Sequence, residues 1–352
     1  MSRYRTLTYR AHAYRSLPRR ILLAAVLLAA VAGCSSGGAP GEASAPQARS
    51  QAEAAPAPAP GSPFWVDPES DAARQVRIYQ GQGRLADAQV LRRIADRPAA
   101  TWPSGDNPQP SIRKAVEGAA KEKRTAVFVA YNIPHRDCGA YSAGGANGAG
   151  DYRAWYRMFA EAIGDAPAIV VLEPDAVAHM VDGCTTPDHH AERYQLLREA
   201  IRQFKRLPDT RVYLDAGNPS WIRDPYGLIE PLRRAGVEKA DGFALNVSNF
   251  QTDAAVRAYG AKVSQGLDGK HFVMDTSRNG EGPLPEDREQ AWCNPPGRSL
   301  GTPPSVSTGD PLVDAFLWIK RPGDSDGPCR GGPSAGTWWP EYALGLAKRA
   351  RF

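Results

Sequence analysis

The sequence predicts an α/β fold in which parallel strands close into a TIM-like β/α barrel within one large domain. From residue 63 onward, short apolar runs recur, each ends in a polar tip, and most are followed by apolar residues spaced three and four apart. This alternation is typical of βα units. Strands that are continuously apolar are usually covered on both faces, which indicates a parallel sheet. Seven such runs in about 290 residues fit a closed barrel better than an open sheet.

The elements follow in order along the chain. The predicted strands are residues 98–102, 125–132, 168–175, 211–217, 242–249, 271–277 and 314–320. The predicted helices are residues 151–164, 191–206, 225–235, 252–266 and 337–350. No GxGxxG or GxxxxGKS motif follows any of the runs, which argues against a dinucleotide or P-loop site.

The first 62 residues predict an export signal and a tether. Residues 1–33 contain a basic segment ending in Arg19 and Arg20 and then an apolar run of 13 residues, which is the pattern of a signal peptide. The run ends in VAGC (31–34), which resembles the lipobox of bacterial lipoproteins and implies lipidation of Cys34; ordinary cleavage with release is the alternative. Residues 34–62 are rich in Ala, Pro, Gly and Ser and predict a disordered linker. We therefore expect an extracellular protein, held at the outer face of the cell membrane if Cys34 carries lipid.

The net charge of +5 originates in this leader. Six arginines precede residue 34 and no acid occurs there, so the rest of the chain has 37 basic and 38 acidic residues. Nucleic-acid binding needs basic residues concentrated on a folded face, so we do not expect a nucleic-acid partner.

Four cysteines remain after Cys34, and an even number in an exported chain favours disulfides over metal ligands. Three pairings are possible, of which sequential pairing closes the shortest loops. No CxxC or HExxH spacing is present, so a zinc site is disfavoured. The four are Cys138, Cys184, Cys293 and Cys329.

Carboxylates and aromatic rings follow the predicted strands. In α/β barrels, catalytic side chains come from the carboxyl ends of the strands. Carboxylates supply general acids and bases and flat rings stack on sugars, so this combination suggests glycoside hydrolysis. The polar and aromatic residues at or just beyond these ends are Trp102, Tyr131, Asn132, Asp137, Glu173, Asp175, Asp215, Asn246, Asn249, Asp275, Lys320 and Asp326.

Two long segments make the interpretation specific. YNIPHRDCGAYSAGG (131–145) and IVVLEPDAVA (169–178) resemble the two signatures of glycoside hydrolase family 6, the inverting β-1,4-glucanases. Further matches, including YLDAG (213–217), WCNP (292–295) and TGDPLVDAFLWIKRPGDSDG (308–327), extend the resemblance over nearly all of residues 63–352. It implies a distorted seven-stranded parallel barrel as the catalytic domain, the two sequential disulfides, a β-1,4-glucan as partner, a monomer, and no metal or organic cofactor.

The resemblance also implies roles for four acids. Asp175 falls on the family's proton donor and Asp137 on a second carboxylate that holds the donor protonated. Asp326 falls on the candidate base, which is disputed in the family because a water chain is an alternative route for the proton. Asp215 falls on a fourth acid with a substrate-binding or field-setting role, and Glu173 is interpreted as a structural acid that binds backbone amides.

Substrate contacts are implied for a further set of side chains. Tyr131 is expected under the sugar at the cleavage point. Two positions depart from the family: Asn218 stands where a His is usual after DAG, and Ala143 where a Ser is common. The other expected substrate-binding residues are Trp102, Trp221, Asn246, Trp292 and Lys320.

The mode of cleavage is predicted from one short loop. Cellobiohydrolases of this family roof their cleft with long loops, one of them between the SDG carboxylate and the last cysteine. Here only Gly327 and Pro328 separate Asp326 from Cys329, which predicts an open cleft and endo cleavage. The alternatives are a cellobiohydrolase of the same family and a non-catalytic glucan-binding lipoprotein.

Overall fold

The computed structural model describes residues 62–285 and 290–352. The predicted signal peptide (1–33), the lipidation site Cys34 and nearly all of the predicted linker (34–62) lie outside the described residues. Within the described ranges, no helix is long and apolar enough to cross a bilayer.

A single parallel sheet forms the centre of the fold. Its strands are hydrogen-bonded in chain order, and all five neighbouring pairs run parallel. The continuously apolar runs therefore do form a parallel sheet, as predicted. The strands are β1 (Ala126–Ala130), β2 (Ala168–Leu172), β3 (Thr210–Asp215), β4 (Gly242–Leu245), β5 (His271–Asp275) and β6 (Val313–Leu317).

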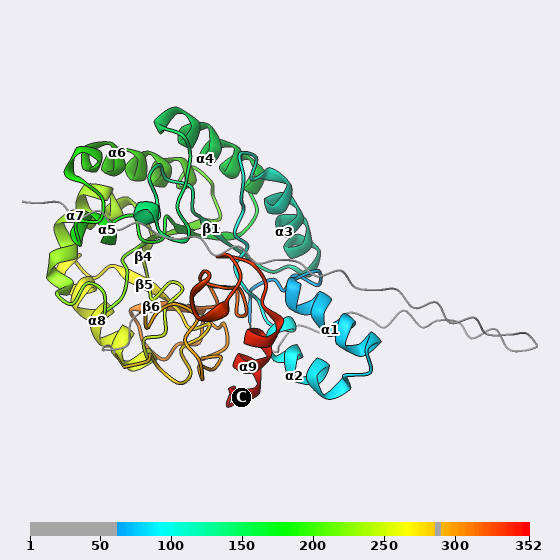
Figure 1. Ribbon diagram of the computed structural model, residues 1–352. Coiled ribbons are helices and arrows are strands. Elements are labelled where there is room, and N and C mark those ends of the chain that lie inside the picture. Colours follow the sequence, from blue (N-terminus) through cyan, green and yellow to red (C-terminus); the bar gives the residue numbers. More distant parts are fainter. Residues whose placement is uncertain (1–61, 286–289) are drawn as a thin grey trace, which may run out of the picture. The chain divides into compact units, whose positions relative to one another are not determined.

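Helices surround the outer side of these strands (Figure 1). The outer set comprises α3 (Gln109–Glu122), α4 (Ala149–Ile163), α5 (Ala178–Val181), α6 (Pro187–Phe204), α7 (Ile229–Ala235) and α8 (Asp253–Gly266). A second group packs together at one side and consists of α1 (Asp71–Gly81), α2 (Leu85–Ala95) and α9 (Pro340–Arg349). Short 3-10 turns are η1 (Asp137–Gly139), η2 (Pro225–Leu228), η3 (Val237–Lys239) and η4 (Cys329–Gly331).

Alternate residues of each strand face two different cores, because strand side chains point to opposite faces. One set packs under the outer helices and includes Phe128, Val170, Leu214, Phe243 and Met274. The other set packs on the inner side of the sheet and includes Val129, Val171, Tyr213, Ala244 and Val273. Residues that continue the inner phase past the strand ends are therefore directed toward the interior rim.

The prediction of seven strands is not confirmed, since the described residues contain six. Residues 98–102 make only an isolated bridge, between Thr101 and Phe128. The segment nevertheless makes hydrogen bonds to two neighbours, β1 and the residue after β6. The Thr101 amide donates to the Val127 carbonyl at 2.9 Å, and the Ala100 amide donates to the Trp318 carbonyl at 2.9 Å. Pro98 begins the segment and Pro103 follows it, and neither has an N–H to donate, which limits the ladder to these few bonds.

The predicted helices are present with shifted ends, and one is divided. Residues 225–235 form η2 followed by α7 rather than one helix. Pro231 lies in the first turn of α7, where proline is tolerated, but it has no N–H to donate to the Gly227 carbonyl, so one regular helix does not continue from η2 into α7. The three helices before β1 were not among the predicted elements.

Candidate active site

The chain turns sharply where β2 ends, and this turn brings Asp175 to the rim. Glu173 and Asp175 have φ values of +47° and +71°, in the left-handed region that L-residues rarely adopt. The Glu173 carboxylate stays buried and accepts the amides of Asn132 at 3.0 Å and Ile133 at 3.0 Å. This confirms Glu173 as an acid that binds backbone amides. Because those amides follow β1, Glu173 ties together the two strand ends that carry Tyr131 and Asp175.

Asp137 and Asp175 lie close together although 38 positions separate them in the chain. One carboxylate oxygen of each and a ring nitrogen of His179 all lie within 4.8 Å of one another. The Tyr131 hydroxyl donates to Asp175 Oδ2 at 3.4 Å, and the Ser142 amide donates to Asp137 Oδ2 at 2.6 Å. Asp137, Asp175, Tyr131 and His179 are called the donor group below.

Asp175 has the electrostatic character of a proton donor. Burial raises the pKa of its carboxyl group, the positive charge of His179 opposes this, and the negative charge of Asp137 adds to the rise, so that the net pKa of Asp175 is about 6. A carboxyl group with such a pKa remains partly protonated near neutrality, which general acid catalysis requires.

Asp215 supports the donor from beneath. Its Oδ2 accepts the Asp175 amide at 2.9 Å and the Gly217 amide at 3.2 Å. Burial, and then the charge of Asp175, raise the pKa of Asp215 to about 8. The contact with Asp175 is thus made to its main chain, and Asp215 fixes the turn that presents the donor carboxyl.

Asp326 belongs to a different group of charges. Its Oδ2 accepts Arg278 Nη1 at 2.9 Å and the Asn294 amide at 3.0 Å, and its Oδ1 lies 3.2 Å from Lys320 Nζ. Burial alone would raise the pKa of Asp326, but Arg278 and Lys320 together hold it below its ordinary value. Among the described residues, no hydrogen bond or ion pair joins Asp326 to Asp175 or Asp137.

The predicted aromatic residues lie at three places on the rim. Trp102 meets the Tyr131 ring edge-on at 5.7 Å, and its Nε1 donates to the Ile319 carbonyl at 2.7 Å. Trp221 Nε1 donates to Asp182 Oδ2 at 2.8 Å. Trp292 is 45% exposed and lies 6.0 Å, centroid to centroid, from the ring of Tyr141. An aromatic ring that is exposed to this degree is available for stacking on a sugar.

Asn246 serves the fold instead of facing solvent. It is fully buried, and its Nδ2 donates to the Asp275 carbonyl at 2.8 Å while its Oδ1 accepts the Gln251 amide at 3.1 Å. The expectation of a direct substrate contact at Asn246 has no support in this geometry. Lys320 is partly exposed and combines its ion pair to Asp326 with a 3.2 Å bond to the Ser325 carbonyl.

The structure contains the two sequential disulfides, Cys138–Cys184 and Cys293–Cys329. The first joins the loop that carries Asp137 to the residues that follow α5. The second joins the loop that carries Trp292 to the loop that carries Asp326. Each disulfide therefore holds one of the predicted catalytic carboxylates beside another segment of the rim.

Several residues that organise the site were missed by the sequence reasoning. Arg193 is buried in α6 and donates to the carbonyls of Pro134 at 3.0 Å and His135 at 2.9 Å, which anchors the loop before Asp137. Arg136 lies over the Tyr131 ring at 4.6 Å. His179, in the donor group, and Arg278, the partner of Asp326, were also missed. Arg136 and its partner Tyr131 both lie in the signature segment 131–145, whereas the partners of the other three are distant in sequence or lie on another element.

Three potential metal ligands meet in the donor group, from Asp137, Asp175 and His179. The positive charge of a protonated His179 offsets one of the two carboxylate charges. The other potential trio, Cys138, His179 and Cys184, has both of its sulfurs in a disulfide. The expectation that no cofactor is needed remains a prediction.

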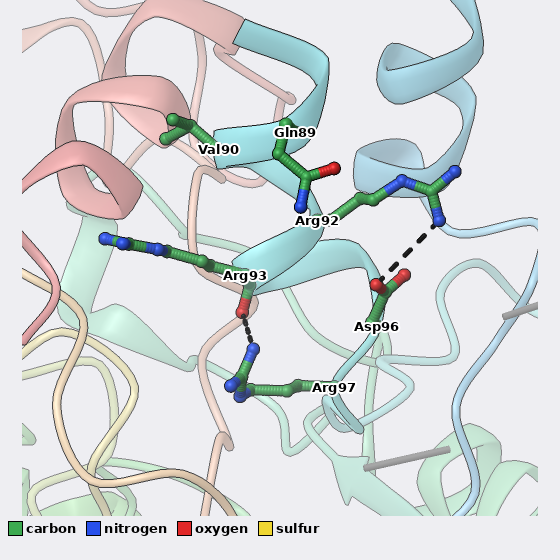
Figure 2. A pocket seen from close by; sticks show the side chains of 6 residues that line it. All are labelled: Gln89, Val90, Arg92, Arg93, Asp96 and Arg97. Atoms are coloured by element: carbon green, nitrogen blue, oxygen red, sulfur yellow. Dashed lines mark hydrogen bonds and ion pairs between the residues drawn. The ribbon is translucent and has the colours of Figure 1, made fainter. Parts of the chain in front are cut away.

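A small surface pocket lies elsewhere, on α2. Figure 2 shows Arg92 directed toward Asp96 and Arg97 toward the Arg93 carbonyl. None of its lining residues is a predicted site residue. They are Gln89, Val90, Arg92, Arg93, Asp96 and Arg97.

Comparison with known protein families is decisive for classification. The sequence model described as "Glycosyl hydrolases family 6" matches residues 59–350, which is most of the chain. The chain belongs to this family.

Named members of family 6 are similar over most of the chain. Endoglucanase A of Cellulomonas fimi is 40% identical over 299 residues, which cover 84% of this chain and 63% of the relative. Endoglucanase 1 of Streptomyces halstedii is 42% identical over 291 residues, covering 80% and 87%. The chain thus spans somewhat less than two thirds of the first relative.

A solved structure shares the fold. The endoglucanase Cel6 of Mycobacterium tuberculosis, determined in complex with a thio-linked cellobioside, superposes with a TM-score of 0.76 and is 41% identical. The match covers 82% of this chain and 97% of that one.

One departure from the family 6 pattern has a clear local role. Asn218 is buried, and its Oδ1 accepts the amides of Ser220 at 3.1 Å and Trp221 at 3.2 Å. The amide side chain thus forms an Asx turn that places Trp221. Nothing in the structure explains the alanine at position 143.

Replacing Asp175 is expected to stabilise the protein in a pH-dependent way. The folded state raises the pKa of Asp175 to about 6. The contribution of Asp175 to the stability of the fold is therefore full at pH values below the ordinary pKa of an aspartate, and it is lost as pH rises through 6. Asp175→Asn should therefore gain about 2 kcal/mol in unfolding free energy over wild type between pH 4 and pH 8. Urea unfolding at both pH values measures this gain, with the exposed Asp209→Asn as the matched control. An equal difference between variant and wild type at both pH values would contradict it.

Proposed function

We propose that this chain hydrolyses internal β-1,4-glucosidic bonds of cellulose or a related β-glucan, with inversion of the anomeric carbon. The observation that carries the proposal is the donor group, in which burial and the charge of Asp137 raise the pKa of Asp175, so that part of the carboxyl population stays protonated near neutral pH. Membership of family 6 and relatives named as endoglucanases support the substrate class.

Asp175 is the general acid in this proposal. Its proton passes to the leaving glycosidic oxygen as the bond to the anomeric carbon breaks. Tyr131, whose hydroxyl reaches Asp175 at 3.4 Å, lies where it can support the sugar at the cleavage point. Asp215 holds the Asp175 main chain, so the acid meets the substrate in one orientation.

The route of the water's proton is inferred from the two remaining acids. An inverting pair that encloses a water needs about 6.5 to 9.5 Å between carboxyl groups. Asp137 and Asp175 have oxygens within 4.8 Å, which suits a field-setting role for Asp137 better than direct contact with a water on the opposite face. Asp326 is neutralised by Arg278 and Lys320 and is a poor proton acceptor. We infer that the proton reaches Asp137 through a chain of waters.

The proposed substrate path runs along the rim aromatics. Trp102, Trp221 and Trp292 supply sugar contacts in this proposal, and Lys320 supplies a polar one. Trp102 comes from residues 98–102, which we infer to stand in for a seventh strand of a distorted barrel. Their hydrogen bonds to Val127 and Trp318 support that inference.

The path is proposed to be open at the Asp326 loop. Gly327 and Pro328 alone separate Asp326 from Cys329, and Cys329 is fixed to Cys293. So short a tethered loop leaves no chain to roof the substrate. The exposed rings of Trp292 and Tyr141 support the same view.

Export is proposed from the leader, with residues 1–33 as signal peptide, Cys34 as lipidated residue, residues 34–62 as linker and residues 63–352 as a monomeric catalytic domain. The two disulfides suit an oxidising compartment. An enzyme outside the cell reaches a β-glucan polymer that is too large to enter the cell.

The inverting assignment predicts the first product. Proton NMR of cellohexaose hydrolysis should show the α-anomer before mutarotation, and initial release of the β-anomer would contradict inversion. Asp175→Ala should lose 100-fold or more in turnover on substrates with poor leaving groups, on the order of the contribution of a general acid, and much less with an activated aryl leaving group. Asp209→Asn serves as the control and should keep wild-type turnover.

Endo cleavage predicts a rapid loss of polymer length. In carboxymethylcellulose, viscosity should fall steeply while few reducing ends have formed, because an open path admits internal segments. Viscometry in parallel with a reducing-end assay tests this. Slow viscosity loss with steady cellobiose release would favour a cellobiohydrolase, and binding without any cleavage would favour a non-catalytic glucan-binding lipoprotein.

Lipidation predicts a membrane-bound fraction. The wild-type chain expressed in a bacterial host should partition into detergent with a mass increased by acyl groups, whereas Cys34→Ser should appear in the aqueous phase. Mass spectrometry of the mature N-terminus checks the site. A wild-type chain cleaved at another position and released would refute the anchor.

A further inference from the structure

His179 occupies a position in the donor group that the proposed reaction does not itself require. It lies on α5, four residues after Asp175, and its amide donates to the Asp175 carbonyl at 2.8 Å. This single helical turn carries the imidazole back to the carboxylates of the rim. The side chain is only 13% exposed.

The His179 ring lies between two carboxylates. Nε2 is 3.8 Å from Asp137 Oδ1, and Nδ1 is 3.6 Å from Asp182 Oδ2. These separations are too long for hydrogen bonds, and Nδ1 has no hydrogen-bond partner within the described residues. The interaction is therefore one of charge.

Acidic residues from several segments surround His179. Asp137 comes from η1, Asp182 from the end of α5, Asp175 from the turn after β2, and Asp215 lies beneath at the end of β3. Burial lowers the pKa of His179, but the contact with Asp137 and the charges of Asp175 and Asp182 outweigh it, so the net effect is a raised pKa.

Trp221 completes the surroundings on the remaining side. Its ring lies 4.8 Å from the His179 ring at an interplanar angle of 68°, and its Nε1 donates to the same Asp182. An aromatic neighbour adds no competing charge and favours a cation. Within the part of the chain that the structure describes, neither ring nitrogen makes a hydrogen bond, so packing and charge hold the ring in place.

We propose that protonated His179 is a positioning residue, which holds Asp137 beside Asp175 and sets the proton-donating strength of Asp175 in the hydrolysis proposed above. Asp137 and His179 act on the donor in opposite directions. The negative Asp137 favours the protonated donor, and the positive His179 favours release of its proton. The inference rests on the proposed hydrolytic function and deepens it.

The direction of the effect follows from these signs. His179 in its charged form lowers the pKa of Asp175, so its removal raises that pKa. The donor then keeps its proton to higher pH, and the alkaline limb of the activity profile moves upward. At pH values below that limb, Asp175 is protonated both in the wild type and in a variant without His179. In the variant, Asp175 is the weaker acid, so turnover falls.

The test compares His179→Gln with His271→Gln as a matched control. His271 also pairs with an acid, Nδ1 to Asp314 Oδ1 at 2.8 Å, but it lies at the opposite end of the sheet, where β5 begins. kcat and KM for cellohexaose are measured from pH 4 to pH 9 with EDTA present, so that no metal ion bound between the three groups contributes.

In His179→Gln we expect the alkaline limb to move up by about half a pH unit or more, with a several-fold loss of kcat at pH 5 and little change in KM. His271→Gln should keep the wild-type profile. His179→Lys retains a positive charge and should return the limb toward its wild-type position, which a purely structural role for the imidazole would not produce.

Three outcomes separate the possibilities. If the wild type does not cleave cellohexaose, the proposed function fails, and this inference fails with it. If the wild type cleaves but His179→Gln loses activity equally at all pH values, the function stands and the role of His179 is overturned. If His179→Gln does not fold, an NMR titration of the labelled wild type decides. A His179 midpoint above the ordinary value of about 6.5 supports the proposal, and one below it overturns it.

Discussion

Buried carboxylates at the carboxyl ends of parallel strands impose the main constraint on this structure. Each negative charge taken out of water needs amides or cations around it. Asp275 has four backbone amides, from Ser248, Ser277, Ile319 and Lys320. Glu173 has the amides that follow β1, and Asp326 has two cations. Asp175 is the exception, since its carboxyl group faces one phenolic hydroxyl and a histidine beside further acids. The loops thus give Asp275, Glu173 and Asp326 two or more amide or cation partners each, whereas the carboxyl group of the proposed donor has few partners.

Much of the fold and part of the site could be predicted from the sequence. Continuously apolar runs identified the parallel sheet, because both of its faces are covered. The rule that catalytic side chains follow the carboxyl ends of barrel strands placed Tyr131, Asp215 and Asp275 at one rim. The signature segments brought Asp137 and Asp175 together and implied the disulfide pairing. The sheet could be predicted from local patterns, and the proximity of Asp137 and Asp175 from motifs long enough to identify a family with a known arrangement.

What could not be predicted depends on contacts between distant segments. Residues 98–102 have the composition of a strand, but flanking prolines restrict their pairing to a few bonds. The helix α1 begins with an N-cap, because the Ser70 side chain accepts the Ala73 amide. It precedes the first predicted strand and is absent from the predicted elements. The partnership of Arg278 with Asp326 spans 48 positions and has no local signal. The position of the His179 ring between Asp137 and Asp182 likewise has no local signal, because Asp137 comes from another loop.

The two disulfides have a consequence for how the protein can be produced. Both lie in the loops of the rim and neither crosses the apolar layers beneath the helices. In a reducing cytoplasm the chain retains every apolar residue that forms those layers, while the loops that present Asp137 and Asp326 lose their covalent ties. Solubility and a normal circular dichroism spectrum are therefore poor criteria of correct recombinant material. Titration of free thiols is the more informative quality control.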